Sequence, residues 1–217
     1  MDKSLVQNDI AARVAMELKN GQYINLGIGL PTKVADYVPD GVNVSFHAEN
    51  GFIGLGPAPD ENNIDPTIVN AGGQPSTILP GGAFFDSATS FGIVRGGHLD
   101  MTILGALQVD EKGNIANYMI PGKLVPGMGG AMDLLIGAKK VIVAMEHTAK
   151  GSPKILKECN LPLTAPSCVS MIITEMAVIE VVPEGLLLTE LRNGHSLEEV
   201  QAATDAALIV SKELKTL

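Results

Sequence analysis

The chain has 217 residues, of which 46% are hydrophobic and 18% charged, and this balance predicts one globular α/β domain over residues 1–217. Its formal net charge of −9 disfavours nucleic acid as a partner, because phosphate backbones repel an acidic protein. The longest apolar runs are far shorter than the roughly 20 residues that span a bilayer, and the first residues do not resemble a secretion signal, so we expect a cytoplasmic protein without membrane contact.

The N-terminal segment predicts a helix, a strand and a second helix. Ser4 begins a capping-box pattern, and apolar residues then recur at helical spacing from Ile10 until the pair Asn20-Gly21. Residues 23–26 form a short β-rich run. The glycine turn and proline of residues 27–31 follow, and proline suits the first position of a helix.

Residues 42–48 predict the next strand, because apolar and polar side chains alternate along them. This strand ends at Glu49-Asn50-Gly51, a sequence that permits a steep turn. Residues 52–82 are dense in Gly, Pro, Asn and Asp, and they predict a long irregular loop of the kind that often carries function.

The middle of the chain predicts buried strands over residues 101–107 and 140–145. Between them, residues 131–138 predict a helix that is entered through the glycine turn of residues 127–130. A glycine turn that opens onto a helix leaves backbone N–H groups accessible to a ligand.

The C-terminal part predicts strands over residues 171–182 and 186–191, joined by a hairpin turn, and then a helix that Ser196 and Glu199 cap. Strands and helices alternate over the whole length. We therefore predict an α/β fold with a single open, mostly parallel mixed sheet, helices on both faces, and some antiparallel pairing near the C-terminus.

Glu49 is the strongest candidate for chemistry, because it lies where a strand ends and a turn begins, a common site position in open α/β sheets. Apolar neighbours that would desolvate this carboxylate are Phe46, Phe52, Ile53 and Leu55. A desolvated carboxylate is a competent covalent nucleophile. On the local pattern alone, a solvated turn residue is an equally good interpretation.

The amides of Gly129 and Gly130 are candidates for stabilising an oxyanion, although three glycines in a turn also suit tight packing. The four histidines are isolated in the sequence and predict structural roles. His47 alone shares a strand face with Glu49 and is worth testing. No nucleophile elbow is present, so a hydrolase triad has no support.

The sequence offers no site for a metal or a bound cofactor. Cys159 and Cys168 lie in no Cys-x-x-Cys pair and near no histidine at ligand spacing, so we expect two buried free thiols. Gly27-x-Gly29 lacks the third glycine of a dinucleotide fingerprint, and no phosphate-binding loop of the Walker type occurs.

Several blocks resemble the B subunits of family I coenzyme A (CoA) transferases, in the same order and from about Ile10 to about Leu191. Residues 46–54 resemble the Ser-Glu-Asn-Gly signature that carries the catalytic glutamate of that family. The other matching blocks are Asn25-Leu26-Gly27-Ile28-Gly29, Arg95 to Asp100, Gly113 to Asn117, Pro121-Gly122-Lys123 and Gly129 to Leu134. The family members acting on butyrate, acetate and acetoacetate are the most similar.

This resemblance implies a CoA-transferase (NagB/RpiA-like) type of fold and a ping-pong reaction through a glutamyl-CoA thioester on Glu49. It implies oxyanion support from Gly129 and Gly130. The residues implied to contact the acyl group or CoA are Asn25, Gly27, Gly29, Asn50 and Gly51. CoA is then a substrate, with no cofactor and no metal. The implied partners are acyl-CoA, small carboxylic acids and a CoA-transferase A subunit, in an α2β2 assembly.

Ala48 departs from the family pattern, which has serine before the glutamate, and acyl specificity is the property this change puts in question. Three alternatives remain beside the acetoacetate, butyrate or acetate type of transferase. They are the B subunit of a succinyl-CoA:3-oxoacid CoA-transferase, an acyl-CoA hydrolase in which water intercepts the intermediate, and a non-catalytic metabolite-binding module.

Overall fold

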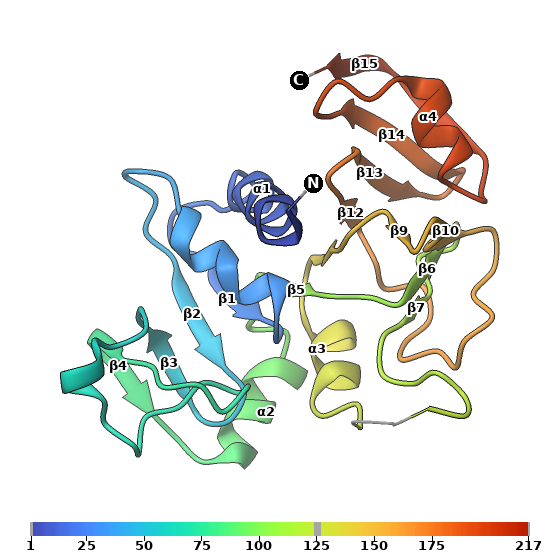
Figure 1. The fold of residues 1–217 in the computed structure, drawn as a ribbon. Coiled ribbons are helices and arrows are strands. Elements are labelled where there is room, and N and C mark those ends of the chain that lie inside the picture. Colours follow the sequence, from blue (N-terminus) through green and yellow to red (C-terminus); the bar gives the residue numbers. More distant parts are fainter. Residues whose placement is uncertain (1, 124–126, 217) are drawn as a thin grey trace.

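A ten-stranded mixed sheet crosses the whole molecule in the computed structural model, which describes residues 2–123 and 127–216 (Figure 1). The strands, in spatial order, are β15 (Leu208–Thr216), β14 (Gly185–Leu191), β13 (Ala177–Val182), β12 (Met171–Ile173), β8 (Val141–Ala144), β5 (Met101–Leu104), β1 (Tyr23–Leu26), β2 (Ser45–Ala48), β3 (Phe52–Leu55) and β4 (Ile78–Phe84). The five from β12 to β2 are mutually parallel, so their carboxyl ends meet at one edge of the sheet.

The central strands are short apolar runs because helices cover both of their faces. Every residue of β5 and β8 is buried, as expected for parallel strands inside a sheet, and this confirms the two strands predicted there. Both strands end earlier than predicted, at Leu104 and Ala144.

Helices pack on the two faces of the sheet, as predicted. On one face, α1 (Lys3–Ala15) and the 3₁₀ helix η1 (Leu30–Tyr37) bury Ile10 and Val34 against the sheet. On the other, α2 (Ser87–Arg95) and α3 (Ala131–Gly137) contribute Val94 and Leu134 to a second core. Figure 1 shows α1 apart from the pair α2 and α3, with the central strands between them. Burying each such side chain stabilises the fold by about 1.5–3 kcal/mol.

Side-chain caps begin two of the predicted helices, and one of these caps differs from its prediction. Asp2 caps α1, because its carboxylate accepts from the Ser4 amide at 2.9 Å, so the capping box predicted at Ser4 is wrong. An aspartate two residues upstream is a strong cap and starts the helix earlier. The predicted box of Ser196 and Glu199 is confirmed at α4 (Leu197–Ala202).

Residues 52–82 do not form one irregular loop as predicted, because β3 and most of β4 lie within them and pair in antiparallel fashion. Gly54 shows why the glycine content of residues 52–82 did not indicate strands. It has φ of +88°, and a Cβ there would lie 2.8 Å from the Gly82 Cα, so glycine is needed where the two strands approach. Irregular chain is confined to the stretch between β3 and β4, apart from the short η2 (Glu61–Asn63).

The C-terminal strands also differ from the prediction. The strand predicted over residues 171–182 is two antiparallel strands, β12 and β13, because Thr174 turns the chain: its hydroxyl accepts from the Met176 and Ala177 amides at 3.1 and 3.0 Å. The hairpin from β13 to β14 is confirmed, with Val182 opposite Gly185. Small strands outside the main sheet are β6 (Gln108–Asp110), β7 (Ile115–Ala116), β9 (Thr148–Ala149), β10 (Ser152–Pro153) and β11 (Ile155–Leu156).

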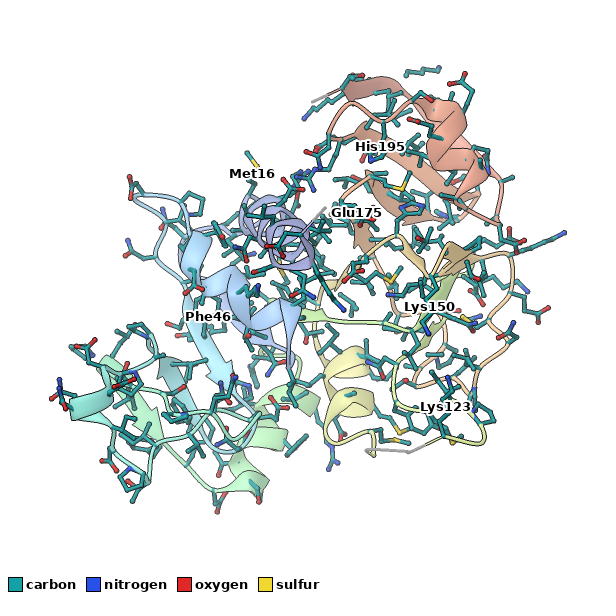
Figure 2. The ribbon with its side chains drawn as sticks, viewed as in Figure 1. Met16, Phe46, Lys123, Lys150, Glu175 and His195 are labelled. Atoms are coloured by element: carbon teal, nitrogen blue, oxygen red, sulfur yellow. The ribbon has the colours of Figure 1, made fainter. Side chains whose placement is uncertain are left out.

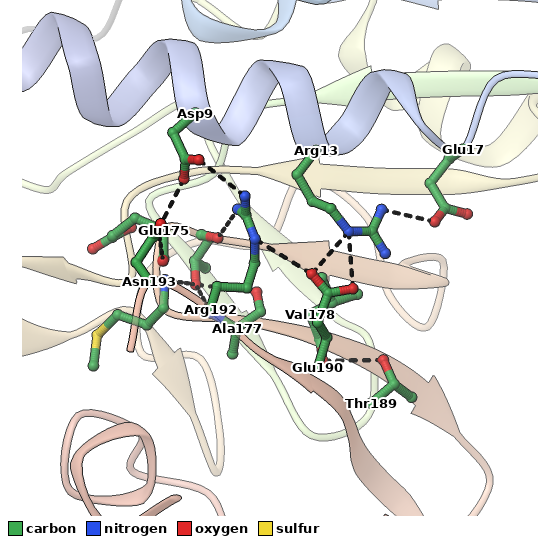
Figure 3. Close-up of polar contacts among 12 residues, drawn as sticks. Asp9, Arg13, Glu17, Glu175, Ala177, Val178, Thr189, Glu190, Arg192 and Asn193 are labelled. Carbon is green, nitrogen blue, oxygen red and sulfur yellow. Dashed lines mark hydrogen bonds and ion pairs between the residues drawn. The ribbon is translucent and has the colours of Figure 1, made fainter. Parts of the chain in front are cut away.

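A network of ion pairs joins α1 to the end of β14 (Figure 3). The Arg13 guanidinium donates to both carboxylate oxygens of buried Glu190, at 3.0 and 3.1 Å. Arg192 pairs with Asp9 at 3.1 Å and with Glu190 at 3.4 Å. Because every charge in this group faces an opposite one, the helix is tied to the sheet without an unpaired buried ion.

The two cysteines are free and half-buried. Burial raises the pKa of the Cys159 thiol to about 12 and that of Cys168 to about 11, so both remain protonated thiols near neutral pH. Within residues 2–123 and 127–216, no group of three His, Cys, Asp or Glu side chains is arranged to hold a metal. None of the helices in the described part of the chain is long and apolar enough to cross a membrane.

Candidate active site

Glu49 follows directly after β2, at the sheet edge where the parallel strands end, and its side chain is half-buried. Its carboxylate accepts a hydrogen bond from the Asn25 side-chain amide at 2.9 Å. The same amide donates to the His47 carbonyl at 3.2 Å. Asn25 lies on the adjacent strand β1, opposite His47, so the parallel register of β1 and β2 brings the amide to the carboxylate.

The orientation of the Asn25 amide is fixed by a third strand. The Thr102 hydroxyl on β5 donates to the Asn25 carbonyl oxygen at 3.2 Å, and Thr102 is the partner of Asn25 in the pairing of β1 and β5. Asn25 and Thr102 are fully buried. With its oxygen occupied in this way, the amide can present only its N–H groups to Glu49.

The main chain of Glu49 is held by α2. The Ser90 hydroxyl donates to the Glu49 carbonyl oxygen at 2.8 Å, and the His47 Nε2 lies 3.0 Å from the same hydroxyl. Because the hydroxyl has one proton and gives it to the carbonyl, His47 is the donor in the second bond. The His47 Nδ1 atom then carries a lone pair, and it is buried without a partner in the described residues.

The glycine turn predicted to support the site does lie beside Glu49. Gly130 is the N-cap of α3, and a Cβ placed on it would be 3.7 Å from the Glu49 Cγ and 2.8 Å from the Phe91 ring. A side chain at position 130 would therefore enter the space between glutamate and phenylalanine. Gly129 has φ of +52°, a conformation that favours glycine, so the backbone shape of this turn depends on glycine at this position.

The other predicted site residues have structural contacts of their own. A Cβ on Gly27 would lie 2.5 Å from the Leu104 side chain, and one on Gly51 would lie 2.5 Å from the Phe85 carbonyl oxygen. Gly29 has φ of +86° and is the N-cap of η1. Asn50 donates to the Val69 carbonyl at 2.8 Å and so anchors the loop after β3.

Two of the four apolar residues predicted beside Glu49, Phe46 and Leu55, lie elsewhere. Phe46 packs in the core beneath α1 and η1, which is the opposite face of β2 from Glu49, and Leu55 packs against the same core. Phe91 on α2 is the aromatic residue beside the site, and no local sequence pattern pointed to it. Ser90 and Thr102 were equally unpredicted, because only the packing of α2 brings Ser90 to Glu49 and only the pairing of β5 with β1 brings Thr102 to Asn25.

Ala48 lies on the opposite face of β2 from the Glu49 side chain. It is buried and borders a cavity of about 450 Å³, with walls that include Leu26, Thr32 and Leu55. Glu49 is not among the described residues that line this cavity. A serine hydroxyl at position 48 would therefore enter the cavity and would not reach the glutamate carboxylate.

The sheet and its edge define the class of this molecule: an open-sheet α/β protein with a carboxylate fixed at the carboxyl end of a parallel strand. The sequence profile described as Coenzyme A transferase matches residues 7–203. The chain belongs to the coenzyme A transferase family.

Relatives match nearly the whole chain. It is 54% identical to the beta subunit of an acetate CoA-transferase of Escherichia coli over 208 residues, which cover 95% of each protein. It is 52% identical to the B subunit of a succinyl-CoA:3-ketoacid coenzyme A transferase of Helicobacter pylori, over 91% of this chain and 95% of the relative. A mitochondrial succinyl-CoA:3-ketoacid coenzyme A transferase of Rattus norvegicus is 50% identical over 100% of this chain but only 42% of its own length.

Solved structures confirm the fold. An acyl-CoA transferase of Escherichia coli matches with a TM-score of 0.77 at 23% identity, over 97% of this chain and 43% of the solved one. A glutaconate coenzyme A-transferase of Acidaminococcus fermentans matches with a TM-score of 0.75 at 16% identity, over 97% of this chain and 88% of the solved one.

Proposed function

We propose that this chain is the glutamate-bearing subunit of a CoA-transferase that exchanges CoA between a small acyl-CoA and a carboxylate of the acetoacetate, butyrate or acetate type. The observation that supports this proposal is the hydrogen bond from Asn25 to the Glu49 carboxylate, beside a glycine turn, in a chain 54% identical to the beta subunit of an acetate CoA-transferase. The 52% identical succinyl-CoA:3-ketoacid relative makes the succinyl-CoA donor the second candidate.

In the proposed reaction, a Glu49 carboxylate oxygen attacks the thioester carbonyl, the C–S bond breaks, and CoA leaves as a thiolate. The product on the protein is a mixed anhydride. The thiolate then attacks the glutamyl carbonyl, which forms a glutamyl-CoA thioester and releases the donor acid as a carboxylate. The acceptor carboxylate reverses these steps and takes up CoA. The thioester energy is thus kept in covalent bonds throughout, and no ATP is consumed.

Asn25 has a specific task in this sequence. Each attack on the glutamyl carbonyl places negative charge on a glutamate oxygen, and the Asn25 amide already lies 2.9 Å from Oε2. A donor that is in place before the charge develops stabilises the transition state without reorganisation, by about 3 kcal/mol. In the proposal, the amides of Gly129 and Gly130 support the oxyanion of the attacked acyl group.

A partner subunit completes the proposed enzyme. The bacterial relatives are named as subunits, and this chain covers only 42% of the rat enzyme, whose remaining length offers room for a second half. We propose that an A subunit supplies the remaining CoA surface and closes the site to water, in an α2β2 assembly. Water exclusion matters because an anhydride or thioester that meets water is hydrolysed.

The proposal predicts covalent trapping at Glu49. Incubation of the assembled enzyme with acyl-CoA, followed by borohydride, should inactivate it and place the reduced adduct only on the Glu49 peptide by mass spectrometry. Glu49→Gln should lower transfer by on the order of 10⁴ or more, because the nucleophile is lost. Glu61→Gln, at an exposed position in η2, is the matched control and should retain full activity.

Two results would count against the proposal. An active Glu49→Gln variant, or an adduct on another residue, would remove Glu49 from the reaction. Release of free CoA at the full rate without any acceptor acid would instead assign the chain to acyl-CoA hydrolysis. A panel of acceptor acids on the wild-type complex separates the acetate type from the succinyl-CoA type.

A further inference from the structure

Phe91 lies beside the side chain of the candidate nucleophile. A Cβ placed on Gly130 would be 2.8 Å from the Phe91 ring and 3.7 Å from the Glu49 Cγ, so the ring and the glutamate border the same small space. The residue before it, Ser90, donates its hydroxyl to the Glu49 carbonyl oxygen at 2.8 Å. Two consecutive residues of α2 therefore act on one glutamate, the first on its main chain and the second next to its side chain.

The strand that carries Glu49 directs its own phenylalanine away from it. Phe46, labelled in Figure 2, packs beneath α1 and η1 on the opposite face of β2. His47 shares the face of Glu49, but its ring stacks on Phe85. Phe91 reaches the glutamate from a different element, α2, so its position depends on how that helix packs.

The Phe91 ring is held in place by the contact between α2 and α3. The Arg95 guanidinium, one helical turn further on, lies 5.9 Å from the centroid of the ring and pairs with Asp133 on α3 at 2.7 Å. A cation in this position is attracted to the face of an aromatic ring. The two helices also approach closely at Gly137, where any side chain would overlap the Val94 carbonyl. The ring is thereby kept against the glycine turn that begins α3.

Water is the competitor that this ring can exclude. A water oxygen that attacks the glutamyl carbonyl of a glutamyl-CoA thioester forms a C–O bond and breaks the C–S bond. The Glu49 carboxylate is restored, one proton goes to the CoA thiolate and the other to solvent, and no CoA reaches the acceptor acid. A protein holds a water molecule through about two to four polar partners. Both N–H groups of the Asn25 amide and the proton of the Ser90 hydroxyl are already donated, and a phenyl ring has neither a donor nor an acceptor to add.

We propose that Phe91 determines whether the acceptor acid or water reacts with the intermediate on Glu49, an inference that rests on the proposed function. The ring presents an apolar surface on which a water molecule loses hydrogen bonds. The alkyl chain of a small carboxylic acid gains contact with the same surface. The ring therefore favours transfer of CoA over its hydrolytic release.

The test compares hydrolysis with transfer in the enzyme assembled with its A subunit. With acetoacetyl-CoA as the donor, free CoA released without an acceptor measures hydrolysis, and acetyl-CoA formed from added acetate measures transfer. Phe91→Ala should raise the ratio of hydrolysis to transfer by about tenfold, because water gains access to the intermediate. Phe91→Leu, which restores apolar bulk, should keep the ratio close to that of the wild type. Phe84→Ala, which removes an exposed phenyl ring from β4, should leave it unchanged.

The outcomes separate this inference from the proposed function. If hydrolysis and transfer fall together in Phe91→Ala, at the wild-type ratio and with borohydride still trapping an adduct on Glu49, the inference is overturned and the role of the glutamate stands. A wild-type enzyme without a Glu49 adduct overturns both.

A second variant covers the case in which Phe91→Ala does not fold. Arg95→Gln changes a side chain that is 69% exposed and frees the ring from its cation. It should raise the same ratio by roughly threefold, in line with the weak attraction that is lost. An unchanged ratio in this variant overturns the inference.

Discussion

Ser90 connects an imidazole to the main chain of the candidate nucleophile. Its hydroxyl donates to the Glu49 carbonyl and accepts from His47, which also stacks on Phe85 with ring centroids 6.0 Å apart. Because Ser90 must accept its second hydrogen bond from His47, the neutral imidazole carries its proton on Nε2. Burial, which lowers the pKa of His47 to about 4, keeps it in that state across the physiological range.

This arrangement predicts that Ser90→Ala reduces kcat by about tenfold with little change in KM, because a small shift of Glu49 away from the Asn25 amide weakens orientation more than substrate binding. Steady-state kinetics of the assembled enzyme measure both constants. Ser87→Ala, on the exposed first turn of the same helix, is the control. Equal kinetics for the two variants would show that the Ser90 contact does not position the glutamate.

His47 also predicts how stability depends on pH. Its folded-state pKa is about 4, below the unfolded value of 6.5, so the unfolded chain binds more protons between these values. The contribution is therefore fully present above pH 6.5 and is lost as the pH falls toward 4, by up to about 3 kcal/mol. Buried His147, with a pKa also about 4, adds a second such contribution.

Denaturant titrations between pH 4 and 7 test this prediction. His47→Gln should flatten the fall in unfolding free energy toward acid pH, whereas His98→Gln, at an exposed position, should follow the wild-type curve. Parallel curves for wild type and His47→Gln would mean that this imidazole titrates alike in the folded and unfolded chains.

Among the elements, those with a strong local pattern were predictable. β5 and β8 are uninterrupted apolar runs, and the capping box of α4 is local chemistry. β15 escaped prediction because it is an edge strand in which only every third residue is partly buried, which does not match the alternation of a half-buried strand. Residues 208–216 form a strand because they pair with β14, and a pairing between separate segments does not appear in a local sequence pattern.

The ion pairs between α1 and β14 predict a large effect from one substitution. Arg13→Met leaves buried Glu190 with only the longer contact to Arg192, and breaking such a pair costs roughly 3–5 kcal/mol of unfolding free energy. Lys139→Met removes a more exposed pair with Asp100 and should cost less than about 1 kcal/mol. Chemical denaturation of both variants gives the comparison, and equal losses would contradict it.

At the scale of the whole molecule, the sequence indicated where the candidate nucleophile lies but not which residues hold it in place. Glu49 was predictable because a strand end and a turn are local features. Asn25 and Thr102 act on it only because β1 pairs with both β2 and β5 in a particular register, and Ser90 because α2 packs over β2. No pattern within one segment encodes such contacts between distant parts of the chain.

At the level of the assembly, we predict that this chain needs a partner subunit for activity. Co-expression with a CoA-transferase A subunit should yield a complex whose native mass equals two copies of each chain. The separate chains should show no CoA transfer, and mixing them should restore it, because each carries part of the proposed site. Full activity in this chain alone would exclude an essential partner.

Because neighbouring residues of β2 face opposite sides of the sheet, Ala48 borders a cavity while Glu49 meets the helix α3. A change of side chain at position 48 therefore alters a hollow on one face of the sheet and leaves the hydrogen bond between Asn25 and the Glu49 carboxylate in place.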